Sequence, residues 1–167
     1  MKGTRWVAGI GLAGMVLALG CATGSVETSP RVVCQDRSRF GIPEGRPQPL
    51  MSEVENLVRV LGLTGAELIP VSEPPPDIQN RREMSEALVR HYPPVLRDSG
   101  VSGTARVAML VAESGRIEHA EVSESTGNPD LDQAALRVAK VIEFSEVRME
   151  GEPICYLVAL PISFIAR

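Results

Sequence analysis

The chain has 167 residues, of which 44% are apolar and 23% charged, enough for one modest globular domain with appendages. Its formal net charge is −4, and after Lys2 the only lysine is Lys140, so the chain lacks the clustered basic surface that a nucleic-acid partner requires. Only 4% of the residues are aromatic, so the core must consist mainly of aliphatic side chains.

The first 20 residues have the pattern of an export signal. Two basic residues precede an apolar run, Trp6 to Leu19, and the sequence Leu17-Ala18-Leu19-Gly20-Cys21 follows the pattern of a bacterial lipoprotein processing site. We therefore expect residues 1–20 to be a signal peptide and Cys21 to be the site of lipid attachment. The alternative is an uncut signal that stays in the membrane as a helix, because the apolar run is close to the minimum length that spans a bilayer.

Two further cysteines, Cys34 and Cys155, make an even pair in a chain that we expect to be exported. They are candidates for a disulfide closing a loop of about 120 residues, which loop entropy alone would make worth about 4–5 kcal/mol. The alternative is two unpaired thiols.

Residues 21–77 are expected to be a tether and linker. Most of this segment has no apolar period, and Pro74-Pro75-Pro76 predicts a stiff spacer before the folded domain. A short helix is expected near residues 52–61, where Ser52 and Glu55 have the spacing of a capping box and the apolar residues share one face.

Residues 78–167 are expected to form the domain. Asn80 and Glu83 predict the start of a helix that Pro93 ends, and Asn128 followed by Pro129 predicts the start of a second helix. Three strands are expected, with a turn at Gly115 between the first two. These strands cover residues 105–111, 117–122 and 154–160. The order helix, strand, strand, helix, strand predicts an α+β fold, with a three-stranded antiparallel sheet packed against helices.

No catalytic or metal-binding motif occurs in the chain: it lacks H-E-x-x-H, G-x-S-x-G, a P-loop and C-x-x-C. We therefore expect no enzyme activity, no catalytic residue, no metal and no cofactor. The carboxylates around the predicted hairpin are expected to be solvated, and an enzyme that uses one of them or a nearby serine is the alternative. They are Glu113, Glu118, Glu121 and Glu124.

The spaced motifs of the second half resemble the C-terminal domain of the TonB family of periplasmic proteins. The resemblance rests on Tyr92-Pro93-Pro94, the segment Gly100 to Gly103, Ser125-Thr126-Gly127, the start of the helix at Leu131, and Pro161-Ile162-Ser163-Phe164. It implies that the last strand receives a short extended segment from an outer-membrane receptor or another envelope protein. Carried over to this chain, the partner-binding edge would consist of Ile154, Tyr156, Val158 and Leu160.

An exposed strand edge is a hazard unless a partner uses it. Three occupants are open at this stage: a partner segment, the N-terminal segment if Cys34 and Cys155 are bridged, and a second copy of the chain. We expect a lipid-anchored binding module on the periplasmic side of the bacterial envelope, and Ala22 after the cysteine resembles lipoproteins sent to the outer membrane. The alternative is an inner-membrane-anchored TonB-like energy transducer for transport through outer-membrane receptors, which requires residues 6–22 to remain as a spanning helix.

Overall fold

The computed structural model describes residues 34, 37–43, 50–63, 65–71 and 76–166, all within one compact unit that spans Arg31–Arg167. Its helices and strands, in chain order, are β1 (Arg39–Pro43), α1 (Met51–Val60), β2 (Glu67–Val71), α2 (Arg81–His91), α3 (Pro94–Asp98), β3 (Gly103–Val111), β4 (Ile117–Glu124), α4 (Pro129–Ala139), β5 (Val147–Met149), β6 (Glu152–Ile154) and β7 (Tyr156–Phe164).

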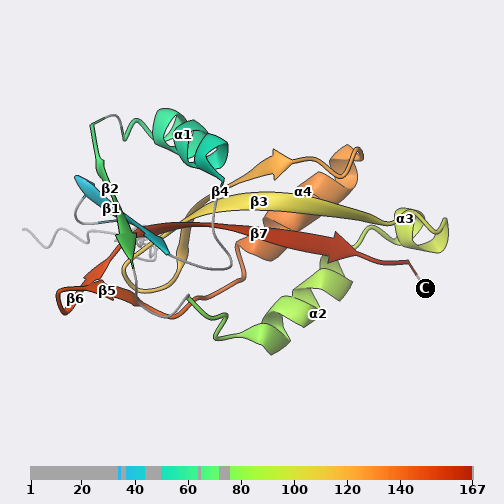
Figure 1. Ribbon diagram of the computed structural model, residues 1–167. Coiled ribbons are helices and arrows are strands. Elements are labelled where there is room, and N and C mark those ends of the chain that lie inside the picture. Colours follow the sequence, from blue (N-terminus) through green and yellow to red (C-terminus); the bar gives the residue numbers. More distant parts are fainter. Residues whose placement is uncertain (1–33, 35–36, 44–49, 64, 72–75, 167) are drawn as a thin grey trace, which may run out of the picture. The chain divides into compact units, whose positions relative to one another are not determined.

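The α+β class is as predicted, but the sheet is larger than expected. Five strands form it in the order β2-β1-β7-β3-β4 (Figure 1). β4, β3 and β7 pair antiparallel, as predicted, whereas β1 pairs parallel with both β2 and β7. The prediction of a three-stranded sheet was therefore wrong, because the segment expected to be a linker contributes two parallel strands. β5 and β6 form a separate two-stranded hairpin.

Both faces of the long strand β3 are buried, and each face belongs to a different core. Val107 and Met109 pack with α4 and with alternate residues of β7 on one face. Ala108 and Leu110 pack on the other face with Leu157 and with residues of α1 and β1. This two-sided burial explains the continuous apolar character of β3, since a strand covered on both faces does not alternate between apolar and polar residues. Helices thus cover both faces of the sheet around β3.

The helix starts differ in how well their capping was predicted. The Asn128 side chain accepts hydrogen bonds from the backbone N–H groups of Asp130 and Leu131, and Pro129 follows at the first helical position, as expected for α4. The Asn80 side chain does not cap α2. Instead its amide donates to the carbonyl of Val141 at 2.8 Å and its oxygen accepts from the N–H of Glu143 at 2.9 Å, so it fixes the start of α2 to the end of α4.

The turn between β3 and β4 packs against backbone that follows α4. Gly115 has a φ of +82°, and a Cβ at this position would lie 2.0 Å from the carbonyl oxygen of Phe144. The N–H of Phe144 donates to the Gly115 carbonyl at 2.8 Å. Only glycine fits both the backbone angle and this close approach.

Candidate protein-binding edge of the last strand

The first residues of β7 are covered by β1. The register between the two strands consists of one pair, Gly41 with Tyr156, and the N–H of Gly41 donates to the carbonyl of Cys155 at 2.9 Å. Ile154, the first residue of the predicted edge, lies in β6 and pairs with Val147. The prediction that residues 154–160 form an open edge strand therefore does not match the structure, since β7 lies between β1 and β3.

A disulfide holds the N-terminal segment at this end of β7. Cys34 and Cys155 are bonded, with their Cα atoms 6.0 Å apart, and they lie 121 positions apart in the sequence. Glu118 of β4 accepts the backbone N–H of Cys34 at 2.7 Å and a hydrogen bond from Arg37 at 2.6 Å. Glu118, which we expected to be solvated, thus binds the N-terminal segment.

The side chains named for the predicted edge do not face outward. Tyr156 and Val158 are fully buried against the helices, and Leu160 is half-buried against the same core. The Tyr156 hydroxyl donates to the carbonyl of Ser145 at 2.8 Å, and burial raises the pKa of this phenol. Tyr156, Val158 and Leu160 hold β7 on the helices, so these side chains are not presented to a partner.

The direction of the backbone groups of β7 follows from its bond to β1. The carbonyl of Cys155 faces β1. The backbone N–H and C=O groups of successive residues in a strand point alternately to its two edges. The odd-numbered residues of β7 therefore direct these groups away from β3. Ala159 is only 1% exposed, whereas Pro161 and Ser163 are exposed. The open part of the edge therefore begins at Pro161, which has no N–H to donate, and includes both backbone groups of Ser163.

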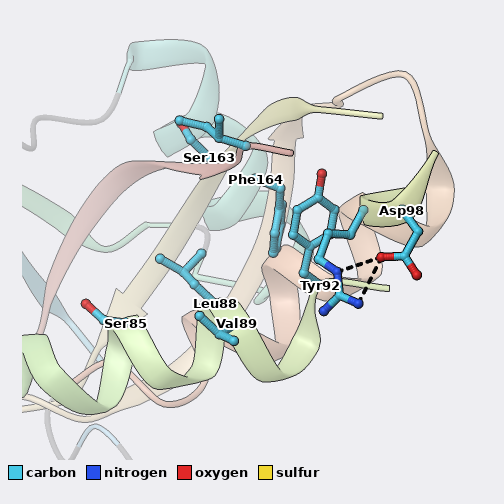
Figure 2. A pocket seen from close by; sticks show the side chains of 9 residues that line it. Ser85, Leu88, Val89, Tyr92, Asp98, Ser163 and Phe164 are labelled. Carbon is cyan, nitrogen blue, oxygen red and sulfur yellow. Dashed lines mark hydrogen bonds and ion pairs between the residues drawn. The ribbon is translucent and has the colours of Figure 1, made fainter. Parts of the chain in front are cut away.

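A pocket lies beside this open end of β7 (Figure 2). Its volume is about 540 Å³. The rings of Tyr92 and Phe164, with centroids 5.2 Å apart, form part of its wall, and Val89 of α2 and Ile165 after β7 leave 73% and 71% of their surface exposed. This pocket could not be predicted from the sequence, because its residues come from segments more than 60 positions apart. The lining residues are Ser85, Leu88, Val89, Tyr92, Arg97, Asp98, Ser163, Phe164 and Ile165.

Comparison with known proteins identifies the part of the chain that builds this edge and most of the pocket lining. Residues 89–166 match the family model of the Gram-negative bacterial TonB protein C-terminal domain. Residues 89–166 are a TonB C-terminal domain. The match begins inside α2 and ends after β7, so it includes the whole open end of β7 but not β1, α1 or β2.

Two similar proteins are both named Protein TonB. The one from Vibrio cholerae serotype O1 is 30% identical over 73 residues, which cover 44% of this chain and 30% of that protein. The one from Xanthomonas campestris pv. campestris strain B100 is also 30% identical over 73 residues, and 33% of its length is covered. The chain thus spans about a third of the length of the curated relatives it matches.

The segment before the TonB domain is bonded to it by buried polar contacts. Glu53 of α1, 5% exposed, accepts hydrogen bonds from the Arg106 guanidinium of β3, the Ser123 hydroxyl of β4 and the backbone N–H of Leu50. Burial alone would raise the pKa of Glu53, but these hydrogen bonds and the charge of Arg106 together hold the pKa below its usual value. α1 begins at Met51 with Leu50 as its N-cap, so the predicted capping by Ser52 was wrong. The Glu53 side chain instead accepts the backbone N–H of Leu50.

Other predictions concern residues that the structure does not describe. Cys21, the expected lipid site, and residues 1–20, the expected signal peptide, lie outside the described residues. In the part that is described, no helix combines the length and apolar character needed to cross a membrane. The same residues contain no group of three or more His, Cys, Asp or Glu side chains placed to hold a metal ion.

Proposed function

We propose that this chain is a protein-binding module of the bacterial cell envelope, and that its TonB domain receives an extended segment of an envelope or outer-membrane receptor protein at the open end of β7. The observation that carries the proposal is the exposure of Pro161 and Ser163, whose backbone groups point away from β3 on a strand whose start is already occupied by β1. An added strand would satisfy these groups through main-chain hydrogen bonds, as in other complexes formed by strand addition.

The structure limits such a strand to a short stretch. β1 and the Cys34–Cys155 bridge occupy the start of β7, and Ala159 is buried, so pairing would be confined to the segment from Pro161 to Ile165. Each main-chain hydrogen bond contributes only about 0.5–1.5 kcal/mol net. We therefore expect weak and reversible binding unless side chains add to it.

The anchor is the second part of the proposal. The match of Leu17-Ala18-Leu19-Gly20-Cys21 to a lipoprotein processing site supports acylation at Cys21, which would tether the TonB domain to a membrane on its periplasmic side. A lipid tether at residue 21 would leave a short segment before Cys34, where the chain is bonded to the start of β7.

Site-specific photo-cross-linking in intact cells tests the binding proposal. A photoreactive residue would replace Ile165, at the open end of β7, and in a control it would replace Val60 of α1, which is also exposed (54%). We expect a cross-link from position 165 to one segment of an envelope protein. The cross-link should disappear in Ser163→Pro, because this change removes the only backbone N–H donor among the exposed residues Pro161 and Ser163.

Three results would contradict the proposal. They are the same product from position 60, a product from position 165 that Ser163→Pro leaves unchanged, and a product that consists only of two copies of this chain. The last would make the edge a site of self-association.

A further inference from the structure

We infer that the pocket beside β7 selects partners that place a large, uncharged apolar side chain at one position of the added segment. The inference rests on the strand addition proposed above, and it adds the chemistry of the partner. The pocket is continuous with the open edge, because Ser163 belongs both to the exposed backbone of β7 and to the pocket lining. An occupant that reaches the pocket along this edge is therefore an extended peptide segment.

The pleat of the sheet determines which residue of the added segment would enter the pocket. Side chains of even-numbered residues in β7, such as Ile162 and Phe164, point to the face that α2 and α4 cover. In paired strands, residues directly opposite each other project to the same face. The residue of the partner that lies opposite Phe164 would therefore point toward α2, between Phe164 and Val89, as the arrangement of these side chains in Figure 2 indicates.

The polar groups of the lining leave no partner for a charged side chain. Arg97 and Asp98 are paired with each other at 2.9 Å, and the Ser85 hydroxyl donates to the carbonyl of Arg81 at 2.9 Å. The Ser163 hydroxyl is paired with the Thr104 hydroxyl at 2.8 Å, and the Tyr92 hydroxyl donates to the carbonyl of Val101 at 2.5 Å. The rest of the lining is apolar. Burying a charge here without a partner would be costly, whereas an apolar side chain would remove exposed apolar surface from water.

Binding of a strand at the open edge also requires an apolar side-chain contact, because the backbone offers little. Pro161 offers a carbonyl but no N–H, and Ala159 is buried, so the backbone alone presents few hydrogen-bonding groups to a partner. In protein interfaces, a few well-buried side chains contribute most of the binding energy. The pocket provides a place for such an anchor at the end of β7 that β1 leaves uncovered.

Peptide titrations followed by NMR test the inference on the full chain in detergent. The probes are seven-residue peptides of threonine with a central alanine, leucine or glutamate. Val89→Lys places a charge at the pocket rim, and the matched control Val95→Lys changes a valine of α3 that is equally exposed (75%) but does not line the pocket. Lysine is a good helix former, so both variants should remain folded.

We expect the leucine peptide to bind wild type and Val95→Lys about tenfold more tightly than the alanine peptide, with the glutamate peptide weakest. In Val89→Lys the preference for leucine should fall to about twofold or less. All peptides that bind should shift the backbone amide signal of Ser163.

Each contrary result has a distinct meaning. Equal affinity for leucine and alanine, with the Ser163 shift retained, would overturn the pocket inference and leave the proposed function standing. A leucine peptide that shifts only pocket side chains, without Ser163, would also overturn the inference, since it separates the pocket from the strand edge. If no peptide shifts Ser163, both the inference and the proposed strand addition fail.

Discussion

Oε1 of Glu53, in α1, lies 2.6 Å from Nε of Arg106, in β3. This ion pair joins the segment that precedes the TonB domain to the strand in the middle of its antiparallel sheet. Glu53 is almost fully buried, and its carboxylate also accepts hydrogen bonds from the Ser123 hydroxyl and the Leu50 N–H. These bonds and the Arg106 pair together compensate the buried charge. α1 is therefore an integral layer of the fold.

Replacing Glu53 with glutamine should destabilise the protein. The substitution keeps the size of the side chain but replaces the charged acceptor of the Arg106 guanidinium with a neutral amide, so we expect the free energy of unfolding to fall by about 2–3 kcal/mol. Urea denaturation measures this, and Glu55→Gln, at an exposed position of the same helix, is the control that should change little. Equal effects of the two variants would show that the buried pair adds nothing.

The stability should also depend on pH through Glu53. Its pKa is lower in the folded state than the usual 4.5, so the unfolded state binds a proton first as the pH falls. The stabilisation is therefore complete above about pH 5 and is lost as the pH decreases through 4.5 toward the folded-state pKa. Denaturation midpoints between pH 7 and pH 3 should fall less in Glu53→Gln than in wild type. Parallel curves for the two proteins would contradict this assignment.

Removing the disulfide should have a large effect, because Cys34 and Cys155 are 121 positions apart. Closing a loop of this length restricts the unfolded chain and is worth about 4–5 kcal/mol in the loop-entropy model. We expect Cys34→Ala with Cys155→Ala to lower the free energy of unfolding by about this amount, and we expect the reduced wild type to behave like the double variant. A difference below about 1 kcal/mol between oxidised and reduced protein would contradict the prediction.

Two glycines with similar backbone angles should respond differently to alanine. Gly151, in the β5–β6 turn, has a φ of +88° and open space where a Cβ would lie, so Gly151→Ala should cost about 1–2 kcal/mol. Gly115 has a φ of +82° but faces the Phe144 carbonyl, so Gly115→Ala should cost about 4 kcal/mol or more. Thermal denaturation of the two variants provides the comparison, and equal losses would show that the contact with Phe144 relaxes easily.

The parts of the fold that follow from local signals were predictable from sequence. Asn128 and Pro129 marked the start of α4, and Gly115 marked the turn between β3 and β4. β1 and β2 were missed because each has five residues, both contain proline, and they pair in parallel with residues 28 positions apart. Parallel pairing of short strands leaves no local signature in the sequence.

The binding edge predicted from the resemblance and the edge proposed from the structure lie on the same strand, but at different ends of it. The resemblance placed the partner on residues 154–160, and sequence alone did not show that β1 pairs at Tyr156. Once β1 occupies that position, only the segment beyond Leu160 is open. The prediction of a solvated Glu118 is likewise wrong, because its partners, Cys34 and Arg37, lie more than 80 positions earlier in the chain and leave no local signal.

The proposed lipid anchor makes a prediction about the mature protein. The intact mass of protein purified from membranes should correspond to a chain that begins at Cys21 and carries acyl groups, and Cys21→Ala should abolish both the cleavage and the added mass. An unprocessed mass that begins at Met1 would contradict the anchor. It would favour residues 6–22 as a membrane helix and the energy-transducer alternative.

Strand addition at β7 requires that the backbone N–H of Ser163 is open to a partner. Amide hydrogen exchange of the isolated full chain, measured by NMR, distinguishes this N–H from that of Ile162, which should face β3 and pair with Ala105. We predict that the amide of Ser163 exchanges about 100-fold faster than those of Ile162 and Leu160. Exchange at Ser163 as slow as at these neighbours would mean that the chain itself already covers this edge, and the proposed strand addition would be contradicted.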